Sequence, residues 1–208
     1  MIDGTSWNER VASPLVPFFE TRDALLAERA GAGGSEVCLP LSDAMDEALV
    51  ELFGETTGAA LVAVGGSGRR RLCFYSDVDV MLLVGGAAPS ALTKAVLYPL
   101  WDSKVAVGHS VRTPREAVAA AEESVETLCS LLTARHLAGD PALLAETLDG
   151  LASLLRSGRR RIGRVLEDEE RTRRSATPYR LLAVDVKQGR GGLRSVDGLD
   201  WDRRARAL

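Results

Sequence analysis

Two aspartates, Asp77 and Asp79, lie one residue apart at the start of the apolar run Val78 to Val84. The side chains of a β-strand alternate between its two faces, so both carboxylates are expected to project to the same side. Two like charges this close are unfavourable unless a cation lies between them, and carboxylate oxygens suit Mg²⁺. The spacing therefore predicts a metal site held by Asp77 and Asp79, with Mg²⁺ as the expected ion and Mn²⁺ as the alternative.

A glycine-rich segment precedes the two aspartates and follows another apolar run, Ala59 to Val64. Glycine lets the backbone turn sharply and brings its amide groups close to an anion, and a serine hydroxyl adds a further donor. The arginine that follows adds positive charge at the same place. We therefore predict that a nucleoside triphosphate binds at Gly65, Gly66, Ser67, Gly68 and Arg69.

An isolated Asp-x-Asp is more often a pair of solvated side chains at a turn than a metal site. Here a glycine turn, a basic segment and the Asp-x-Asp follow one another between two apolar runs, and this joint arrangement favours the metal site. A second glycine-rich segment, Lys187 to Arg194, also carries basic residues. It is typical of a loop that approaches a phosphate or of one that turns tightly, and Lys187 is its candidate nucleotide-binding residue.

The composition excludes several classes of protein. Of the 208 residues, 46% are hydrophobic and 26% charged, which is the balance of an ordinary folded protein. The net charge of −3 disfavours a nucleic-acid partner, since nucleic-acid-binding domains usually carry a basic excess.

Neither a secretory leader nor a long apolar stretch is recognisable, so we expect no membrane partner and a cytoplasmic location. Three scattered cysteines, Cys38, Cys73 and Cys129, suggest no disulfide framework.

The order of the predicted elements indicates an α/β (α+β) fold. Strands are expected within 59–66, 77–84 and 103–113, and helices within 41–54, 88–101 and 113–124. Ser42 is the expected N-cap of the first of these helices, and Thr113 with Glu116 that of the last. From Val125 to Arg174 the pattern is helical, with one break at Asp140. We therefore divide the chain into an N-terminal helical segment (1–58), a core with a small mixed sheet flanked by helices (59–124) and a mostly helical region (125–208) that includes the glycine-rich loop 187–194.

The glycine turn and the aspartate pair together resemble the DNA polymerase β-like nucleotidyltransferase superfamily, which carries a Gly-Gly or Gly-Ser turn followed by Asp-x-Asp. Between about Ala59 and Arg194 the chain is similar to the N-terminal part of the PII uridylyltransferase family, in the segments VAVGGSGRRRLCFYSDVDVMLL, LWDSKVAVGHSVRT, ARHLAGDPALL and VKQGRGGLR. The resemblance implies a nucleotidyltransferase that transfers a nucleoside monophosphate from UTP, or from ATP, to a tyrosine of a PII nitrogen-regulatory protein. Pyrophosphate is the implied leaving group.

One departure from the family concerns the chemistry directly. The superfamily generally takes a third carboxylate from the strand that includes VGHSVRT, yet Ala106 stands where an acid is common and no acid occurs from Ser103 to Arg115. Asp102 and Asp185 are the nearest candidates to replace it. We therefore expect nucleotide binding with slow transfer, because that carboxylate normally helps to bind the catalytic metal and to deprotonate the attacking hydroxyl.

Three functions stay open at this point. The first is nucleotidyl transfer to a PII-type protein, the second is transfer to a small molecule or an RNA, and the third is nucleotide binding by a catalytically weak or inactive relative. Full-length members of the family continue into an HD phosphohydrolase domain and two ACT domains, which these 208 residues do not resemble. The sequence leaves open whether the chain is a fragment or a minimal relative.

Overall fold

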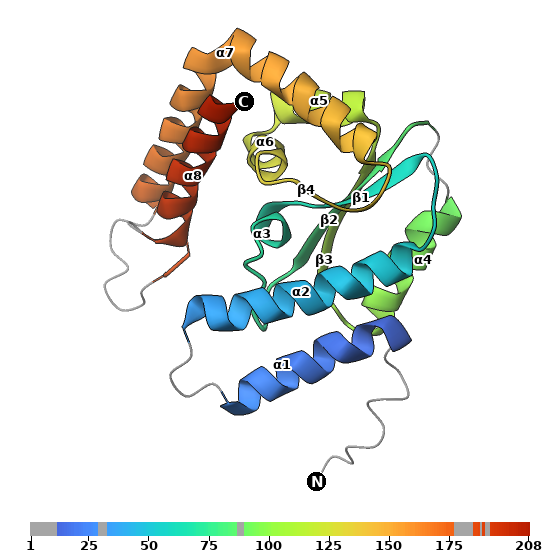
Figure 1. Cartoon of the computed structure of the whole chain (residues 1–208). Coiled ribbons are helices and arrows are strands. Elements are labelled where there is room, and N and C mark those ends of the chain that lie inside the picture. Colours follow the sequence, from blue (N-terminus) through green and yellow to red (C-terminus); the bar gives the residue numbers. More distant parts are fainter. Residues whose placement is uncertain (1–11, 29–32, 87–89, 177–184, 188, 190–191) are drawn as a thin grey trace.

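A four-stranded sheet forms the centre of the fold in the computed structural model, which describes residues 12–28, 33–86, 90–176, 185–187, 189 and 192–208 (Figure 1). Its strands are β1 (Ala59–Ala63), β2 (Val78–Val84), β3 (Val107–Arg112) and β4 (Arg135–Gly139), arranged in the order β3-β2-β1-β4. Strands β2 and β3 are parallel, whereas β1 is antiparallel to both of its neighbours. The expected α+β fold with a mixed sheet is confirmed.

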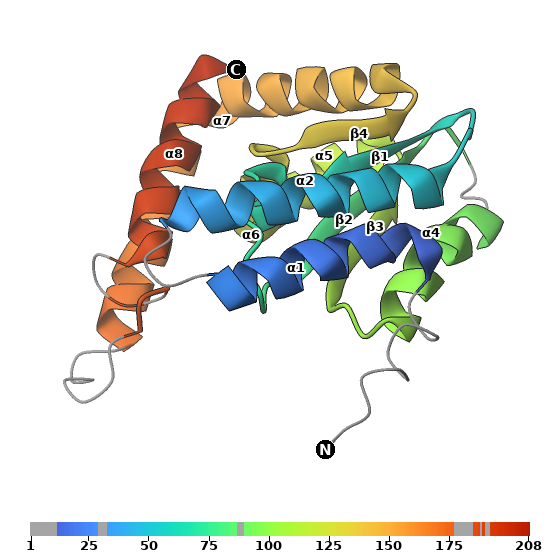
Figure 2. The same cartoon turned by 60° about the horizontal axis from the view of Figure 1, so that its bottom comes forward.

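Helices cover both faces of this sheet. One face carries α1 (Val16–Glu28), α2 (Gly34–Phe53) and α4 (Ser90–Asp102), while the other carries α5 (Pro114–Glu123), α6 (Val125–Leu131), α7 (Pro141–Ala176) and α8 (Leu193–Ala207). Figures 1 and 2 both show α8 lying beside α7, with α1 and α2 on the opposite side of the sheet. In the described part of the chain, no helix is both long enough and apolar enough to cross a membrane.

The alternation of side chains along β2 decides which face the aspartates occupy. Val80 and Leu82 pack into the core beneath α1, α2 and α4, whereas Met81 and Leu83 pack into the core beneath α5 to α8. Both faces are buried, which explains why the strand is apolar from Val80 to Val84 and does not alternate with polar residues there. Asp79 has the parity of Met81 and Leu83, so it faces the layer that contains α5 to α8.

The helix before β1 begins earlier than we predicted. Helix α2 starts at Gly34 and continues through Pro40, so Ser42 is not an N-cap but a buried residue whose Oγ accepts the Leu72 N–H at 3.2 Å. Packing of the helix against the core outweighs the local cost of the internal proline, which removes one helical hydrogen bond. The predicted end of the helix at Gly54 is confirmed, with φ at +61°.

Strand β4 was not expected, and the prediction of continuous helix between Val125 and Asp140 was therefore wrong. The segment Arg135–Gly139 is short and does not alternate, so its sequence carries little strand signal. It forms a strand because the second edge of β1 offers backbone groups that need hydrogen-bond partners. This pairing adds Arg135–Gly139, which belongs to the predicted helical region, to the sheet.

Other local predictions are confirmed. Thr113 caps α5 by accepting the Glu116 N–H at 3.3 Å, and the Glu116 carboxylate accepts the Thr113 N–H at 2.8 Å. The Asp140 carboxylate accepts the Ala142 N–H at 2.9 Å at the start of α7. These caps depend only on residues three or fewer positions apart, which is why the sequence predicts them well.

Candidate active site

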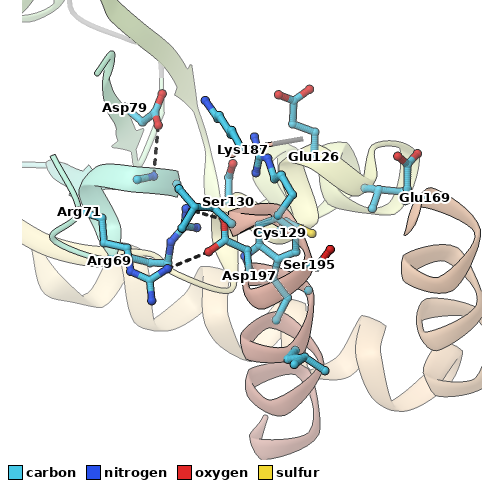
Figure 3. A pocket seen from close by; sticks show the side chains of 18 of the residues that line it. Arg69, Arg71, Asp79, Glu126, Cys129, Ser130, Glu169, Lys187, Ser195 and Asp197 are labelled. Atoms are coloured by element: carbon cyan, nitrogen blue, oxygen red, sulfur yellow. Dashed lines mark hydrogen bonds and ion pairs between the residues drawn. The ribbon is translucent and has the colours of Figure 1, made fainter. Parts of the chain in front are cut away.

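The glycine turn and Asp79 are in direct contact. Gly65–Gly68 form a single short helical turn, α3, immediately after β1. The Asp79 Oδ2 atom accepts the Gly66 N–H at 3.3 Å (Figure 3). The Asp79 N–H donates to the Ser67 Oγ atom at 2.9 Å. The structure therefore brings the predicted anion-binding turn and one predicted metal ligand to a single place.

Close packing explains why glycines occupy this turn. Gly65 has φ at +54°, and a Cβ atom there would lie 2.7 Å from the Asp79 Oδ2 atom. A Cβ atom at Gly68 would overlap the backbone carbonyl of Thr133. At Gly66 the corresponding distance to Asp79 Oδ2 is 3.7 Å, an ordinary contact, so Gly65 and Gly68 are the sterically required glycines of the turn.

The neighbouring strand β3 is also shaped around Asp79. Gly108 pairs with Asp79 in the parallel register, and a Cβ atom at Gly108 would lie 2.7 Å from the Asp79 Oδ1 atom. The two carboxylate oxygens of Asp79 therefore point toward two glycines on either side of β2. We did not predict a role for Gly108, because the need for a small residue there arises only from the pairing of β2 with β3.

The electrostatics of Asp79 fit a site that holds a cation. Burial raises the pKa of the Asp79 carboxyl above its usual range, and the charge of Asp77 raises it further. The Gly66 N–H, Arg69 and Lys187 act in the opposite direction. A divalent cation between Asp77 and Asp79 would relieve this repulsion, and the set of carboxylate oxygens suits Mg²⁺ or Mn²⁺. Within the described ranges no cluster of three or more His, Cys, Asp and Glu side chains has the geometry of a metal site.

A large cleft opens beside these residues. It has a volume of about 1410 Å³ and lies between the glycine turn, the segment before β2 and the helices α6, α7 and α8. Its size suits a nucleotide together with part of an acceptor. The residues that line it include Gly65, Gly66, Asp77 and Asp79, the basic Arg69, Arg71, Lys187 and Arg194, and the acidic Glu126, Glu167, Glu169 and Glu170.

Arg69 is held by helix α8. Its side chain is only 11% exposed and lies 3.4 Å from the Asp197 carboxylate, to which Arg71 also donates at 2.8 Å (Figure 3). The Arg69 guanidinium also lies over the ring of Trp201, at 5.8 Å from the ring centroid. Burial lowers the pKa of Arg69, and Asp197 opposes this shift. Arg71, with 49% of its side chain exposed, is the more accessible cation at the cleft.

We did not predict a role for Asp197 or Trp201, because the spacing of residues along α8 does not indicate which segment they contact. Lys187, the predicted nucleotide-binding residue of the glycine-rich loop, lines the cleft, and its charge acts on Asp79. Its own N–H donates to the Asp185 Oδ1 atom at 3.0 Å. In the same glycine-rich loop, Gln188, Arg190 and Gly191 lie outside the described residues.

The two candidates for a third carboxylate, Asp102 and Asp185, are not among the described residues that line the cleft with Asp77 and Asp79. Asp102 ends α4. Ala106 is exposed, and its carbonyl accepts the Val78 N–H at 2.8 Å. Because Ala106 lies two residues before Gly108 along an extended segment, it is on the same face of the sheet as Asp79. That position, and not Asp102, is adjacent to the aspartate pair.

The fold and this arrangement of a glycine turn against an aspartate pair define a protein of the nucleotidyltransferase fold. No protein-family model matches the chain. Bifunctional uridylyltransferase/uridylyl-removing enzymes are similar to it: that of Mycobacterium tuberculosis is 41% identical over 154 residues, and those of Streptomyces coelicolor and Ralstonia nicotianae are 39% and 34% identical over 168 and 209 residues. These matches cover 71%, 76% and 93% of the chain. The chain belongs to the PII uridylyltransferase family, and it spans about a fifth of the length of these relatives, 19%, 20% and 24%.

Proposed function

We propose that the chain transfers a nucleoside monophosphate from UTP, with ATP as the alternative donor, to a protein acceptor. The proposed acceptor is a tyrosine hydroxyl of a PII-type signalling protein, and the leaving group is pyrophosphate. The observation that carries this proposal is the contact between Asp79 and the Gly66 N–H, which joins a carboxylate and an anion-binding turn at one edge of the cleft. The names of the relatives support uridylyl transfer as the class of reaction.

In this proposal each part of the site has a separate task. The backbone N–H groups of the glycine turn bind the β- and γ-phosphates, with Arg71 and Lys187 adding positive charge from the walls of the cleft. Asp77 and Asp79 hold Mg²⁺, or Mn²⁺, which supplies charge neutralisation and activation of the attacking oxygen when bound. The acceptor hydroxyl then attacks the α-phosphorus, the bond to the β-phosphate oxygen breaks, and the hydroxyl proton leaves to a base.

A second candidate function rests on the strand beside Asp79. Position 108 of β3 is glycine, and position 106, just before the strand, is alanine, so the described residues here offer no third carboxylate to the aspartate pair. A protein with this site would bind a metal-bound nucleotide but transfer it slowly. Transfer to a small molecule or an RNA is the third alternative, and no contact among the described residues of the cleft favours it over a protein acceptor.

The test is incubation of the chain with radiolabelled UTP or ATP, MgCl₂ and a purified PII protein. We expect label on the PII protein, carried by a tyrosine, with loss of labelling in Asp77→Asn and Asp79→Asn. Asp102→Asn is the matched control, since Asp102 is outside the cleft, and should keep the wild-type rate. Mg²⁺-dependent nucleotide binding without labelling would favour the second candidate, and absence of both binding and labelling would contradict the proposal.

A further inference from the structure

Two of the three cysteines meet beside the cleft. The Sγ atoms of Cys38, on α2, and Cys73, in the segment before β2, lie 3.3 Å apart although 35 residues separate them in sequence. Cys73 is exposed and lines the cleft, whereas Cys38 is half-buried. The third cysteine, Cys129, is buried on α6. Neither the proposed nucleotidyl transfer nor the packing of the core requires two thiols in contact at this surface.

The backbones that carry Cys38 and Cys73 are held together by other contacts. Ser42, one turn along α2 from Cys38, accepts the N–H of Leu72 at 3.2 Å, and Asp43 forms an ion pair with Arg70. A disulfide bond is about 2.05 Å long, so the sulfur atoms need to approach by only about 1 Å from their present separation. The existing contacts therefore reduce the conformational cost of forming a bond between them.

The segment around Cys73 is also fixed locally. The Cys73 N–H donates to the Ser76 Oγ atom at 3.1 Å, and the Ser76 N–H donates to the Cys73 carbonyl at 3.1 Å. This turn presents the Cys73 sulfur toward α2 and leaves it accessible to solvent from the cleft. A small disulfide molecule that enters the cleft can therefore reach Cys73 without unfolding of the protein.

We propose that Cys38 and Cys73 form a covalent modification site that reacts with low-molecular-weight disulfides to give a reversible intramolecular disulfide. In the first step the Cys73 thiolate attacks one sulfur of the small disulfide, which gives a mixed disulfide and releases one small thiol. In the second step Cys38 loses its proton to solvent and attacks the Cys73 sulfur, which releases the second small thiol. Two protein thiols are oxidised, and one small disulfide is reduced to two thiols.

The environments of the three thiols predict the order in which they react. Burial, together with the adjacent Cys73, raises the pKa of Cys38 to about 11, so Cys38 is poorly suited to make the first attack. Burial raises the pKa of Cys129 to about 12 and also hides it from solvent. Cys73 is the accessible thiol and reacts first, and Cys38 resolves the mixed disulfide because its sulfur is already in contact.

The cross-link would act on one wall of the candidate active site. Cys73 lies between Arg71 and Asp77, which both line the cleft, and the disulfide would attach this wall covalently to α2. The proposal concerns thiol chemistry and does not depend on nucleotidyl transfer. Its test therefore measures thiols, so that its outcome is separate from the test of the proposed function.

The experiment uses the whole chain, fully reduced and then freed of reductant. The protein is incubated with oxidised glutathione, quenched with an alkylating reagent and analysed by intact mass and peptide mapping. We expect loss of two of the three thiols, a peptide pair joined through Cys38 and Cys73, and full recovery of the thiols after reduction. The same incubation in denaturant should lose this preference for one pair.

Single variants separate the two steps. Cys38→Ser should stop at one glutathione adduct on Cys73, and Cys73→Ser should keep Cys38 reduced over the same period. Cys129→Ser is the matched control and should form the Cys38–Cys73 disulfide at the wild-type rate. Three thiols retained in the folded wild-type chain, a persistent glutathione adduct without the internal bond, or a disulfide that includes Cys129 would each overturn the proposal.

Discussion

The Asp197 carboxylate, on the last helix, accepts a hydrogen bond from the Arg71 guanidinium at 2.8 Å and forms an ion pair with it, although 126 residues separate the two in sequence. Arg69 reaches the other oxygen of the same carboxylate at 3.4 Å. The Asp197 side chain is only 7% exposed, so this contact joins α8 to the end of the glycine turn through a desolvated charge. The wall of the cleft formed by α8 is thus attached to the residues that we expect to bind phosphate.

Asp197→Asn should destabilise the protein strongly. The substitution removes the charge that balances Arg69, whose guanidinium then stays largely buried without a carboxylate, and breaking a buried pair from one side costs about 3 kcal/mol or more. Urea unfolding measures the loss in the free energy of unfolding. The control is Asp202→Asn on the same helix, which removes a solvent-exposed pair with Arg206 and should cost far less. Equal losses in the two variants would contradict the role of Asp197.

Acidification should weaken metal-dependent nucleotide binding through Asp79. Only the deprotonated carboxylate binds a cation, and burial raises its pKa above the ordinary value of 3.8, so the loss of Mg²⁺ affinity begins at a higher pH than for an exposed aspartate. Calorimetric titration with Mg²⁺ and nucleotide at several pH values measures this. Asp102→Asn is the control and should keep the wild-type pH profile, because Asp102 does not line the cleft. The titration of the nucleotide itself is common to all variants.

Without metal, ionisation of Asp79 lowers the stability of the fold, whereas metal binding requires the ionised form. A carboxyl whose pKa is raised on folding contributes stability that is present below the pKa of the unfolded chain and is lost as the pH rises through the folded pKa. Asp79→Asn should therefore unfold at a higher temperature than the wild type at neutral pH in the presence of a chelator, and the difference should shrink on acidification. A lower melting temperature at neutral pH would contradict this assignment.

Gly108→Ala should disturb the metal site without unfolding the sheet. The added Cβ atom would lie 2.7 Å from the Asp79 Oδ1 atom, so the carboxylate must move away from its present position. We expect Mg²⁺-dependent nucleotide affinity to fall by about tenfold, which corresponds to about 1.4 kcal/mol. Gly158→Ala on α7 is the control, because a Cβ atom there meets nothing within 4 Å, and alanine is the better helix former. Unchanged affinity in Gly108→Ala would show that Asp79 can shift without consequence.

Ala106→Glu should raise the rate of transfer. Ala106 is exposed on the same face as Asp79, so a glutamate there would add the third carboxylate that β3 lacks. We expect at least a tenfold increase in the rate of the single-turnover reaction with labelled UTP, with little change in nucleotide affinity. Ala119→Glu, an exposed position on α5, controls for the added charge alone. A wild-type rate of about 1 per second or more, or no gain in Ala106→Glu, would contradict the expected handicap.

The sequence alone determined those features that depend on near neighbours. The glycines after the first apolar run predict a sharp turn, which the structure shows as Gly65–Gly68. The shared side of Asp77 and Asp79 stays a prediction from the strand period, since β2 begins at Val78. The caps at Thr113 and Asp140 follow from residues two or three positions away. These features could be predicted because the backbone geometry of a few consecutive residues is enough to produce them.

Only the tertiary structure decided which distant residues meet. Strand β4 exists because the edge of β1 needs a partner, and Gly108 has to be small because β3 lies parallel to β2. The Arg71–Asp197 ion pair and the contact between Cys38 and Cys73 join segments that are 126 and 35 residues apart. No local pattern encodes such contacts, because they arise when two helical layers pack on opposite faces of one sheet and so fix which surfaces face each other.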